Sequence, residues 1–249
     1  MTELDLLIDL HLRNHRQGPG STTETLKAMA LTGLNPASPL NVADIGCGTG
    51  ASTLILARET NWQIRAVDLF PAFLKKLEKQ ASSLAPKQTI SLAQEDMNQL
   101  SFKAQSLDLI WSEGAIYSMG FANGLKKWRE FLVDDGILAI SEICWTSANR
   151  PAEIEAYWNA EYPEIATLEE KAKQLESHGY ELINSFILES NSWLNNYFEP
   201  LEQTIPLFLE EHKHSELAKK VVEAHRMEYE LYRKFQAYYS YGFFIARKI

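Results

Sequence analysis

The sequence contains only two cysteines, Cys47 and Cys144, among its 249 residues. Two cysteines are too few for a disulfide framework or a cysteine-rich zinc site, so we expect a reduced, cytoplasmic protein. Basic residues are also scarce, because 24 Lys and Arg stand against 33 Asp and Glu and leave a net charge of −9. This excess of negative charge argues against nonspecific binding to nucleic acids or anionic membranes, whose phosphates attract basic surfaces.

Long apolar segments are absent as well. No apolar run approaches ~18 residues, so the sequence predicts no transmembrane helix. The first residues include Glu3, Asp5 and Asp9 but no basic stretch, which argues against a signal peptide. What the chain does have is 45% hydrophobic and 23% charged residues, a balance typical of a globular protein. Its length fits one domain.

Residues 1–39 predict a helical cap. Apolar residues recur between residues 4 and 12, which indicates an amphipathic helix. Gly18-Pro19-Gly20 ends this helix. Ser21 then begins a second helix, with Glu24 completing a capping box.

Residues 40–145 alternate between short apolar runs and amphipathic stretches. This alternation predicts βαβ units, whose right-handed crossovers build a parallel, doubly wound sheet. We expect strands at 42–45, 64–67, 89–93, 107–111 and 137–143, and helices at about 51–60, 71–84 and 123–133.

Residues 146–249 are expected to add helices and closing strands to the same domain. The runs 180–188 and 239–246 have the character of strands. Between them we expect helices at roughly 200–212 and 214–237, as an insertion before the last strand. The whole chain, residues 1–249, is therefore expected to be one α/β domain.

The most informative segment runs from Asp44 to Gly50 and reads Asp-Ile-Gly-Cys-Gly-Thr-Gly. It ends a predicted strand and opens a predicted helix. Glycines permit positive φ angles and let a ligand lie against bare backbone. The helix that follows offers unpaired N–H groups and the positive end of its dipole, so a phosphate or a carboxylate could bind there.

Two classes of enzyme share such a loop. Gly46, Gly48 and Ala51 satisfy the dinucleotide pattern G-x-G-x-x-G/A, and Asp68 lies near the position of its ribose-binding acid. A nicotinamide-dependent oxidoreductase is therefore one hypothesis. Asp44, however, precedes the first glycine, and a carboxylate there would repel a pyrophosphate. It would instead suit the ammonium of an amino acid, or would order the loop.

The spacing D-x-G-x-G-x-G resembles the first motif of the class I S-adenosylmethionine-dependent methyltransferases, and later positions agree. Asp68 ends the second predicted strand, where the family's acid binds the ribose hydroxyls. Asp96 follows the third, where the family's acid meets the adenine amine. The runs 180–188 and 239–246 resemble the family's closing strands. The motif spellings are similar to those of the ubiquinone/menaquinone-biosynthesis-like and glycine/sarcosine-type small-molecule branches.

The resemblance implies a Rossmann-like, doubly wound sheet of seven mostly parallel strands with an antiparallel last strand. It implies S-adenosylmethionine as the methyl donor in an in-line displacement, with S-adenosylhomocysteine as the product and no metal. Arg16 would pair with the cofactor carboxylate, and Ser21 would offer it a hydrogen bond. The other cofactor-binding residues implied are Asp44, Gly46, Cys47, Gly48, Thr49, Gly50, Asp68, Leu69, Asp96 and Met97.

The sequence indicates fewer of the residues that bind the methyl acceptor. Glu113 follows the fourth predicted strand, at the edge where open α/β sheets bind ligands. We expect it to be a general base, a contact to the acceptor or a turn acid. This segment lacks the Asn-Pro-Pro-Tyr motif of DNA and some protein methylases, which counts against methylation of amides and of base amines. Tyr117, Trp145 and Trp193 are expected to line the acceptor pocket, where aromatic faces would hold a planar or cationic acceptor.

Other conspicuous residues have structural interpretations. His212 and His214 are expected on a solvated helix end. The tyrosines near the carboxyl terminus are expected to serve core packing or a homodimer contact: Tyr229, Tyr232, Tyr238, Tyr239 and Tyr241. A non-catalytic S-adenosylmethionine-binding protein is a further hypothesis, because methyl transfer needs no fixed catalytic group.

Overall fold

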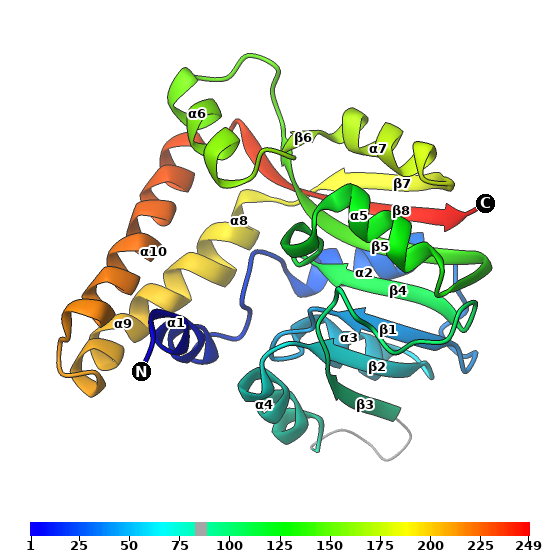
Figure 1. Cartoon of the computed structure of the whole chain (residues 1–249), viewed down its shortest axis with the longest axis horizontal. Coiled ribbons are helices and arrows are strands. Elements are labelled where there is room, and N and C mark those ends of the chain that lie inside the picture. The colour runs from blue at the N-terminus through cyan, green and yellow to red at the C-terminus, as the bar shows by residue number, and fades with distance from the viewer. Residues whose placement is uncertain (83–88) are drawn as a thin grey trace.

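The computed structural model describes residues 1–82 and 89–249. Its centre is one sheet in the order β3-β2-β1-β4-β5-β8-β7, with the short β6 beside β5 (Figure 1). The strands are β1 (Asn41–Ile45), β2 (Gln63–Asp68), β3 (Thr89–Gln94), β4 (Leu107–Glu113), β5 (Leu132–Trp145), β6 (Ala166–Thr167), β7 (Tyr180–Ile187) and β8 (Tyr239–Lys248).

Strand direction follows the doubly wound pattern. The pairs β1–β2, β1–β4, β2–β3 and β4–β5 are parallel, whereas β8 runs antiparallel to both β5 and β7. The strand order reverses between β1 and β4, and such a reversal opens a crevice at the carboxyl ends of the strands. The predicted α/β sheet with an antiparallel last strand is thus confirmed. The two-residue β6 is an addition that the sequence did not indicate.

Helices cover both faces of the sheet and its carboxyl edge (Figure 1). No helix among the described residues is both long and apolar enough to cross a membrane. The helices are α1 (Glu3–Leu12), α2 (Thr22–Leu31), α3 (Ala51–Glu59), α4 (Pro71–Ala81), α5 (Phe121–Arg129), α6 (Ala152–Glu161), α7 (Leu168–Ser177), α8 (Ser190–Trp193), α9 (Glu199–Glu211) and α10 (Glu216–Phe235), with short turns η1 (Ile116–Met119) and η2 (Leu194–Phe198).

The alternation of side chains along each strand explains the two helical layers. Val42 of β1 belongs to the core that contains Ala28 of α2 and Leu56 of α3. The next residue, Ala43, belongs to the core that contains Leu125 of α5. Successive strand residues point to opposite faces, so a strand that is apolar throughout is buried only when helices cover both faces.

A further apolar core lies beyond the carboxyl edge of the sheet, where α1, α9 and α10 stand together (Figure 1). Leu10 of α1, Phe208 of α9 and Val222 of α10 are buried in it with Trp145 of β5 and Tyr239 of β8. This core joins the N-terminal helix to the insertion before the last strand. The two helices predicted in that insertion are confirmed as α9 and α10.

Two predicted helices end early. The helix predicted over 123–133 ends at Arg129, because Leu132 pairs with Leu107 and so begins β5. Here strand pairing overrides a helical apolar pattern. The helix predicted over 71–84 ends at Ala81, and residues 83 and 84 lie outside the described residues.

Ser21 caps α2 as predicted, but only half of the capping box forms. The Ser21 hydroxyl accepts a hydrogen bond from the Glu24 backbone N–H at 3.1 Å. The Glu24 carboxylate does not return to the Ser21 backbone but accepts from the Ser21 hydroxyl at 2.8 Å, the Glu189 N–H at 2.8 Å and the Ser192 hydroxyl. Glu24 therefore fastens α2 to the start of α8.

We predict that Glu24→Ala lowers the free energy of unfolding by about 1–3 kcal/mol, since it leaves the Glu189 N–H and the Ser192 hydroxyl without their acceptor. Urea unfolding followed by circular dichroism measures the difference. Glu59→Ala, at the exposed end of α3, is the control and should change stability by less than about 0.5 kcal/mol. Equal stability of the two variants would contradict the fastening role of Glu24.

Candidate active site

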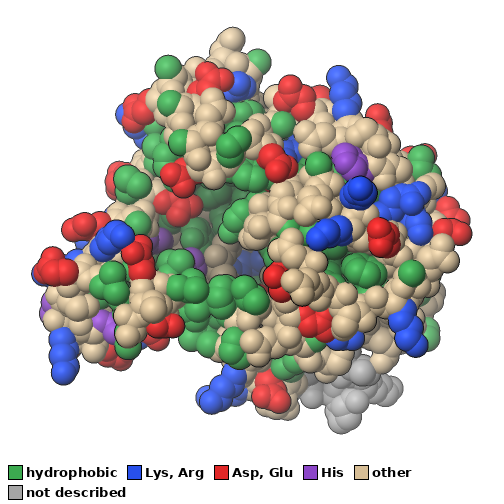
Figure 2. All heavy atoms as spheres, viewed as in Figure 1, with side chains coloured by type: hydrophobic (Ala, Val, Ile, Leu, Met, Phe, Trp, Pro, Cys, Tyr) green, Lys and Arg blue, Asp and Glu red, His purple; other side chains and the backbone are tan. Residues whose placement is uncertain are grey.

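A cavity of about 730 Å³ opens at the carboxyl ends of β1, β2 and β4. Residues of α1 and the segment 16–19 line it on one side, and α10 reaches it from the insertion. Figure 2 shows a hollow in this face of the molecule, with hydrophobic side chains gathered around it. The glycine loop forms one end of the cavity and aromatic side chains form the other, so two chemically different moieties can lie in it together.

The glycine loop leaves bare backbone at the first end. Gly46 and Gly48 line the cavity with φ angles of 73° and 55°, a conformation that favours glycine. A Cβ atom on Gly46 would lie 2.3 Å from the Ala115 side chain, and one on Gly50 would lie 2.2 Å from Leu77. The loop is therefore closely packed from behind, and α3 begins directly after it.

Asp44 supports this loop from beneath. Its carboxylate is fully buried and accepts hydrogen bonds from the hydroxyls of Ser52 at 2.9 Å and Thr53 at 2.6 Å, in the first turn of α3. Burial raises the pKa of Asp44 to about 7. Asp44 does not line the cavity. Of the two roles that the sequence left open, the geometry agrees with ordering the loop and not with holding an ammonium.

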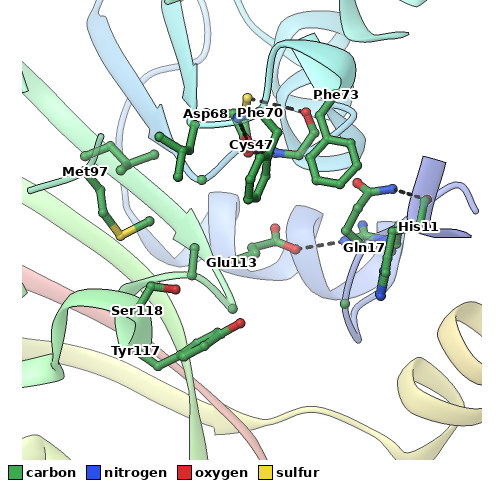
Figure 3. A pocket seen from close by; sticks show the side chains of 18 of the residues that line it. His11, Gln17, Cys47, Asp68, Phe70, Phe73, Met97, Glu113, Tyr117 and Ser118 are labelled. Atoms are coloured by element: carbon green, nitrogen blue, oxygen red, sulfur yellow. Dashed lines mark hydrogen bonds and ion pairs between the residues drawn. The ribbon is translucent and has the colours of Figure 1, made fainter. Parts of the chain in front are cut away.

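Asp68 lies beside the loop at the end of β2. It lines the cavity, and its two oxygens accept from the Gly48 N–H at 2.8 Å and the Phe70 N–H at 2.9 Å. Burial raises the pKa of this carboxyl. Figure 3 shows Asp68, Cys47 and Phe70 together across the cavity from Tyr117 and Ser118. A carboxylate held by two backbone N–H groups is rigid and can receive hydroxyl donors from a ligand.

The rim beyond Asp68 holds three of the other residues that the sequence singled out. Leu69, Asp96 and Met97 all line the cavity. Asp96 is exposed and accepts from the Asn98 N–H at 2.8 Å, a bond that lowers the pKa of its carboxyl. The neighbouring Glu95 forms an ion pair with Arg65 and bonds to Ser101, so its carboxylate is already occupied.

Besides Asp44, three residues assigned to cofactor binding do not line the cavity: Ser21, Thr49 and Gly50. The Thr49 N–H donates to the Gln17 side chain at 2.8 Å and so ties the loop to the N-terminal segment. The Ser21 hydroxyl is used in the cap of α2. Their contacts in the structure are internal, which the local sequence pattern could not distinguish from ligand contacts.

Arg16 and Glu113 form a buried ion pair in the wall of the cavity. Arg16 Nη1 lies 2.9 Å from Glu113 Oε2, and both side chains are almost fully buried. The other Glu113 oxygen accepts from the Thr25 hydroxyl at 2.8 Å and from Trp111 Nε1 at 3.0 Å. Figure 3 shows Glu113 at the centre of the site with this bond drawn. The N-terminal segment is thus attached to the end of β4.

This ion pair alters two assignments made from the sequence. Arg16 is expected there to meet the cofactor carboxylate, but its charge is neutralised by Glu113 within the protein. Glu113 is expected to be a base or an acceptor contact, but both of its oxygens accept hydrogen bonds from protein groups. The arrangement agrees with a positioning role for Glu113, which holds a wall of the cavity in place.

The second end of the cavity is aromatic. Tyr117, Trp158, Trp193, Tyr197 and Tyr241 line it. Trp193 is almost completely buried, and its Nε1–H donates a hydrogen bond to the Ser240 hydroxyl at 3.0 Å. This bond fixes the orientation of the Trp193 ring. Tyr117 is 47% exposed and marks the outer part of this wall. Tyr117 and Trp193, which the sequence predicts for the acceptor pocket, both line this cavity.

Trp145, predicted to line the acceptor pocket, lies in a buried core, whereas Tyr241, predicted in core packing or a subunit contact, lines the cavity. Trp145 is absent from the cavity wall and is buried in the core beyond the sheet edge, with Arg150 over its ring at 4.5 Å. In the register of β5 and β8, Tyr241 lies opposite Ile143 and Trp145 lies opposite Tyr239. Trp145 is therefore one pair further along the strands, where it packs in the core with Tyr239, while Tyr241 reaches the cavity.

Two polar residues in the aromatic end were not singled out from the sequence. His11 of α1 stacks on Tyr197 at 6.0 Å between ring centroids, and burial lowers its pKa to about 4. Its imidazole is therefore neutral near pH 7. Glu228 of α10 faces the same space. Each residue lies on an amphipathic helix, where only tertiary packing decides which positions reach a cavity.

Metal ligation and thiol chemistry have no support among the described residues. No group of three or more His, Cys, Asp or Glu side chains is arranged to hold a metal ion there. His212 instead lies 2.8 Å from Asp9. Cys47 lines the cavity but is buried, and burial raises the pKa of its thiol, so it is not a thiolate near pH 7.

One family model matches the part of the chain that contains the glycine loop. Residues 42–136 match the family model described as a methyltransferase domain. A solved structure of an S-adenosylmethionine-dependent methyltransferase from Geobacter sulfurreducens, in complex with S-adenosyl-L-homocysteine, superposes with a TM-score of 0.86. The match covers 98% of each chain at 18% sequence identity, so it establishes a shared fold.

Two curated relatives are similar over shorter stretches. A tRNA1(Val) (adenine(37)-N6)-methyltransferase from Haemophilus influenzae is 36% identical over 85 residues, which are 33% of this chain and 37% of that protein. A 2-methyl-6-phytyl-1,4-hydroquinone methyltransferase from Synechocystis is 27% identical over 150 residues, which are 55% of this chain and 45% of that protein. The chain thus matches less than half the length of each relative.

We predict that Glu113→Gln lowers the free energy of unfolding by about 3–5 kcal/mol, because it leaves the buried Arg16 charge without its partner. Urea unfolding of the ligand-free protein measures the loss. The double variant Arg16→Met/Glu113→Gln should recover a large part of it, since neither charge then remains buried. A general base without a positioning role would show no loss of stability and no recovery.

Proposed function

We propose that this chain, which carries a methyltransferase domain in the class I S-adenosylmethionine-dependent fold, transfers a methyl group from S-adenosylmethionine to a small-molecule acceptor. The observation that carries the proposal is the single cavity shared by the glycine loop, Asp68 and the aromatic wall. Its volume of about 730 Å³ lies within the usual range of ~300–1,000 Å³ for ligand pockets.

The residues at the polar end fit the cofactor. The backbone of Gly46 and Gly48 would lie against its amino-acid part, because no side chain fits at Gly46. Asp68, held rigid by two N–H donors, would accept hydrogen bonds from the ribose hydroxyls. Asp96 and Met97 on the rim would contact the adenine. When bound, S-adenosylmethionine supplies a methyl group on a positively charged sulfur, which is the electrophile of the reaction.

The protein contributes binding and alignment. The Arg16–Glu113 pair holds the segment 16–19 over the cavity, and this segment excludes water from one side of it. The aromatic wall positions the acceptor on the side opposite Asp68 (Figure 3). Holding nucleophile, methyl carbon and sulfur in line can lower the barrier by up to about 7–11 kcal/mol in favourable cases.

A small acceptor agrees better with the site than a nucleic acid does. The aromatic end of the cavity lies between the sheet and α10, and the chain carries a net charge of −9. Recognition of RNA rests largely on contacts between basic side chains and phosphates. The relative that is named for tRNA methylation matches only a third of this chain.

Isothermal titration of the purified chain with S-adenosylhomocysteine and, separately, with NADH tests the proposal. We expect S-adenosylhomocysteine to bind at micromolar concentration and NADH not to bind. Binding of NADH alone would contradict the proposal and favour a nicotinamide-dependent oxidoreductase. Binding of S-adenosylhomocysteine without methylation of any compound in an acceptor screen of amines and aromatic hydroxyls would favour a non-catalytic binding protein.

We predict that Asp68→Ala weakens S-adenosylhomocysteine binding by roughly 1–3 kcal/mol, since the ligand's hydroxyls lose their acceptor and the Gly48 N–H loses its own. Titration calorimetry of wild type and variant gives the two dissociation constants. Glu78→Ala, at an exposed position of α4, removes a carboxylate outside the cavity and should leave the constant unchanged. An unchanged constant for Asp68→Ala would remove Asp68 from the site.

A further inference from the structure

We infer that the acceptor is an amine, which binds in its ammonium form between the Glu228 carboxylate and the aromatic wall of the cavity and gives one proton to that carboxylate before its nitrogen attacks the methyl carbon. The nitrogen–carbon bond then forms as the sulfur–carbon bond breaks, and the sulfur keeps that electron pair in S-adenosylhomocysteine. The inference rests on the proposed function, because it names the substrate class of the same site. It depends on the Glu228 carboxylate, which lines the cavity and acts electrostatically on the phenols of Tyr197 and Tyr241 in the aromatic wall.

Glu228 is the charged residue of α10 that lines the cavity, and it has no ion-pair partner among the described residues. Arg226 pairs with Glu202 at 3.2 Å, and Lys234 pairs with Glu153 at 2.6 Å. Arg233 is bound to Glu230. The cations of this helix are thus engaged on its outer surface, while Glu228 is half-buried and faces the cavity.

The surroundings of Glu228 leave its negative charge uncompensated. Burial, and secondly the like charge of Glu161, raise the pKa of Glu228 to about 7. Burial and the Glu228 carboxylate both raise the pKa of the phenols of Tyr197 and Tyr241, which share the cavity wall. An unpaired carboxylate in such a place costs free energy that a bound cation would recover.

The aromatic neighbours suit the same cation. Tyr117, Trp158, Tyr197 and Tyr241 line the space that Glu228 faces. The faces of such rings attract ammonium groups, and a partly dehydrated carboxylate adds a charge-assisted hydrogen bond. A carboxylate or phosphate group placed there would be repelled by Glu228. A neutral acceptor would leave that carboxylate unpaired.

A pair of isosteric probes tests the inference without any variant. Choline carries a trimethylammonium group, and 3,3-dimethyl-1-butanol has carbon in place of the nitrogen and no charge. Each is titrated at pH 8, where Glu228 is ionised, into wild-type protein saturated with S-adenosylhomocysteine. We expect choline to bind at least tenfold more tightly than the neutral probe. Equal binding of both, or no binding of choline, would overturn the inference.

Glu228→Gln identifies the group responsible. This variant keeps the side-chain shape and should lose at least tenfold in choline affinity, with the affinity for 3,3-dimethyl-1-butanol unchanged. Glu223→Gln is the matched control, because it removes the same charge from an exposed position of α10 outside the cavity, and it should bind choline within twofold of wild type. Equal losses in both variants would mean a general field of the acidic chain and contradict a site at Glu228.

The first titration of each protein, with S-adenosylhomocysteine alone, separates the two proposals. A chain that does not bind S-adenosylhomocysteine contradicts the proposed function. A chain that binds it but does not distinguish choline from its neutral isostere contradicts the amine acceptor alone.

Discussion

The buried ion pair between Arg16 and Glu113 connects the two parts of the molecule that form the cavity. Glu113 ends β4, and Arg16 lies between the two N-terminal helices, so their bond closes the segment 16–19 over the crevice of the sheet. Two buried charges are stable only while both are present, since either one alone is expensive to bury. This pairing, together with the bond from the Thr49 N–H to Gln17, holds the segment over the cavity, and the bonds from Thr25 and Trp111 keep the Glu113 carboxylate in place.

Each end of the cavity has its own support. Asp44 orders the first turn of α3 from below, and Asp68 holds the glycine loop from the side. At the other end, Trp193 is fixed by Ser240 and by stacking on Tyr232 at 4.5 Å. The polar end, which suits a nucleoside-bearing cofactor, and the aromatic end, which Glu228 faces, are thereby held in a fixed relative position, as in-line transfer requires.

Much of the sheet and the polar half of the site could be predicted, because those features depend on neighbouring residues. The short apolar runs, the three glycines and the acid that ends β2 follow from backbone geometry and from spacing along the chain. The errors arose where distant partners intervened. The Glu24 carboxylate binds the Glu189 N–H at the start of α8 instead of completing the capping box. Leu132 pairs with Leu107 in the sheet instead of continuing the expected helix.

Local patterns of residues specify the doubly wound sheet, the glycine loop and the position of Asp68 at the end of β2. Contacts between distant parts of the chain set the rest: Glu113 pairs with Arg16, 97 residues away, Tyr241 lines the cavity in place of Trp145, and His11 and Glu228 face it. The physical reason is that the packing of helices and strands from distant parts of the chain selects which side chains reach the cavity.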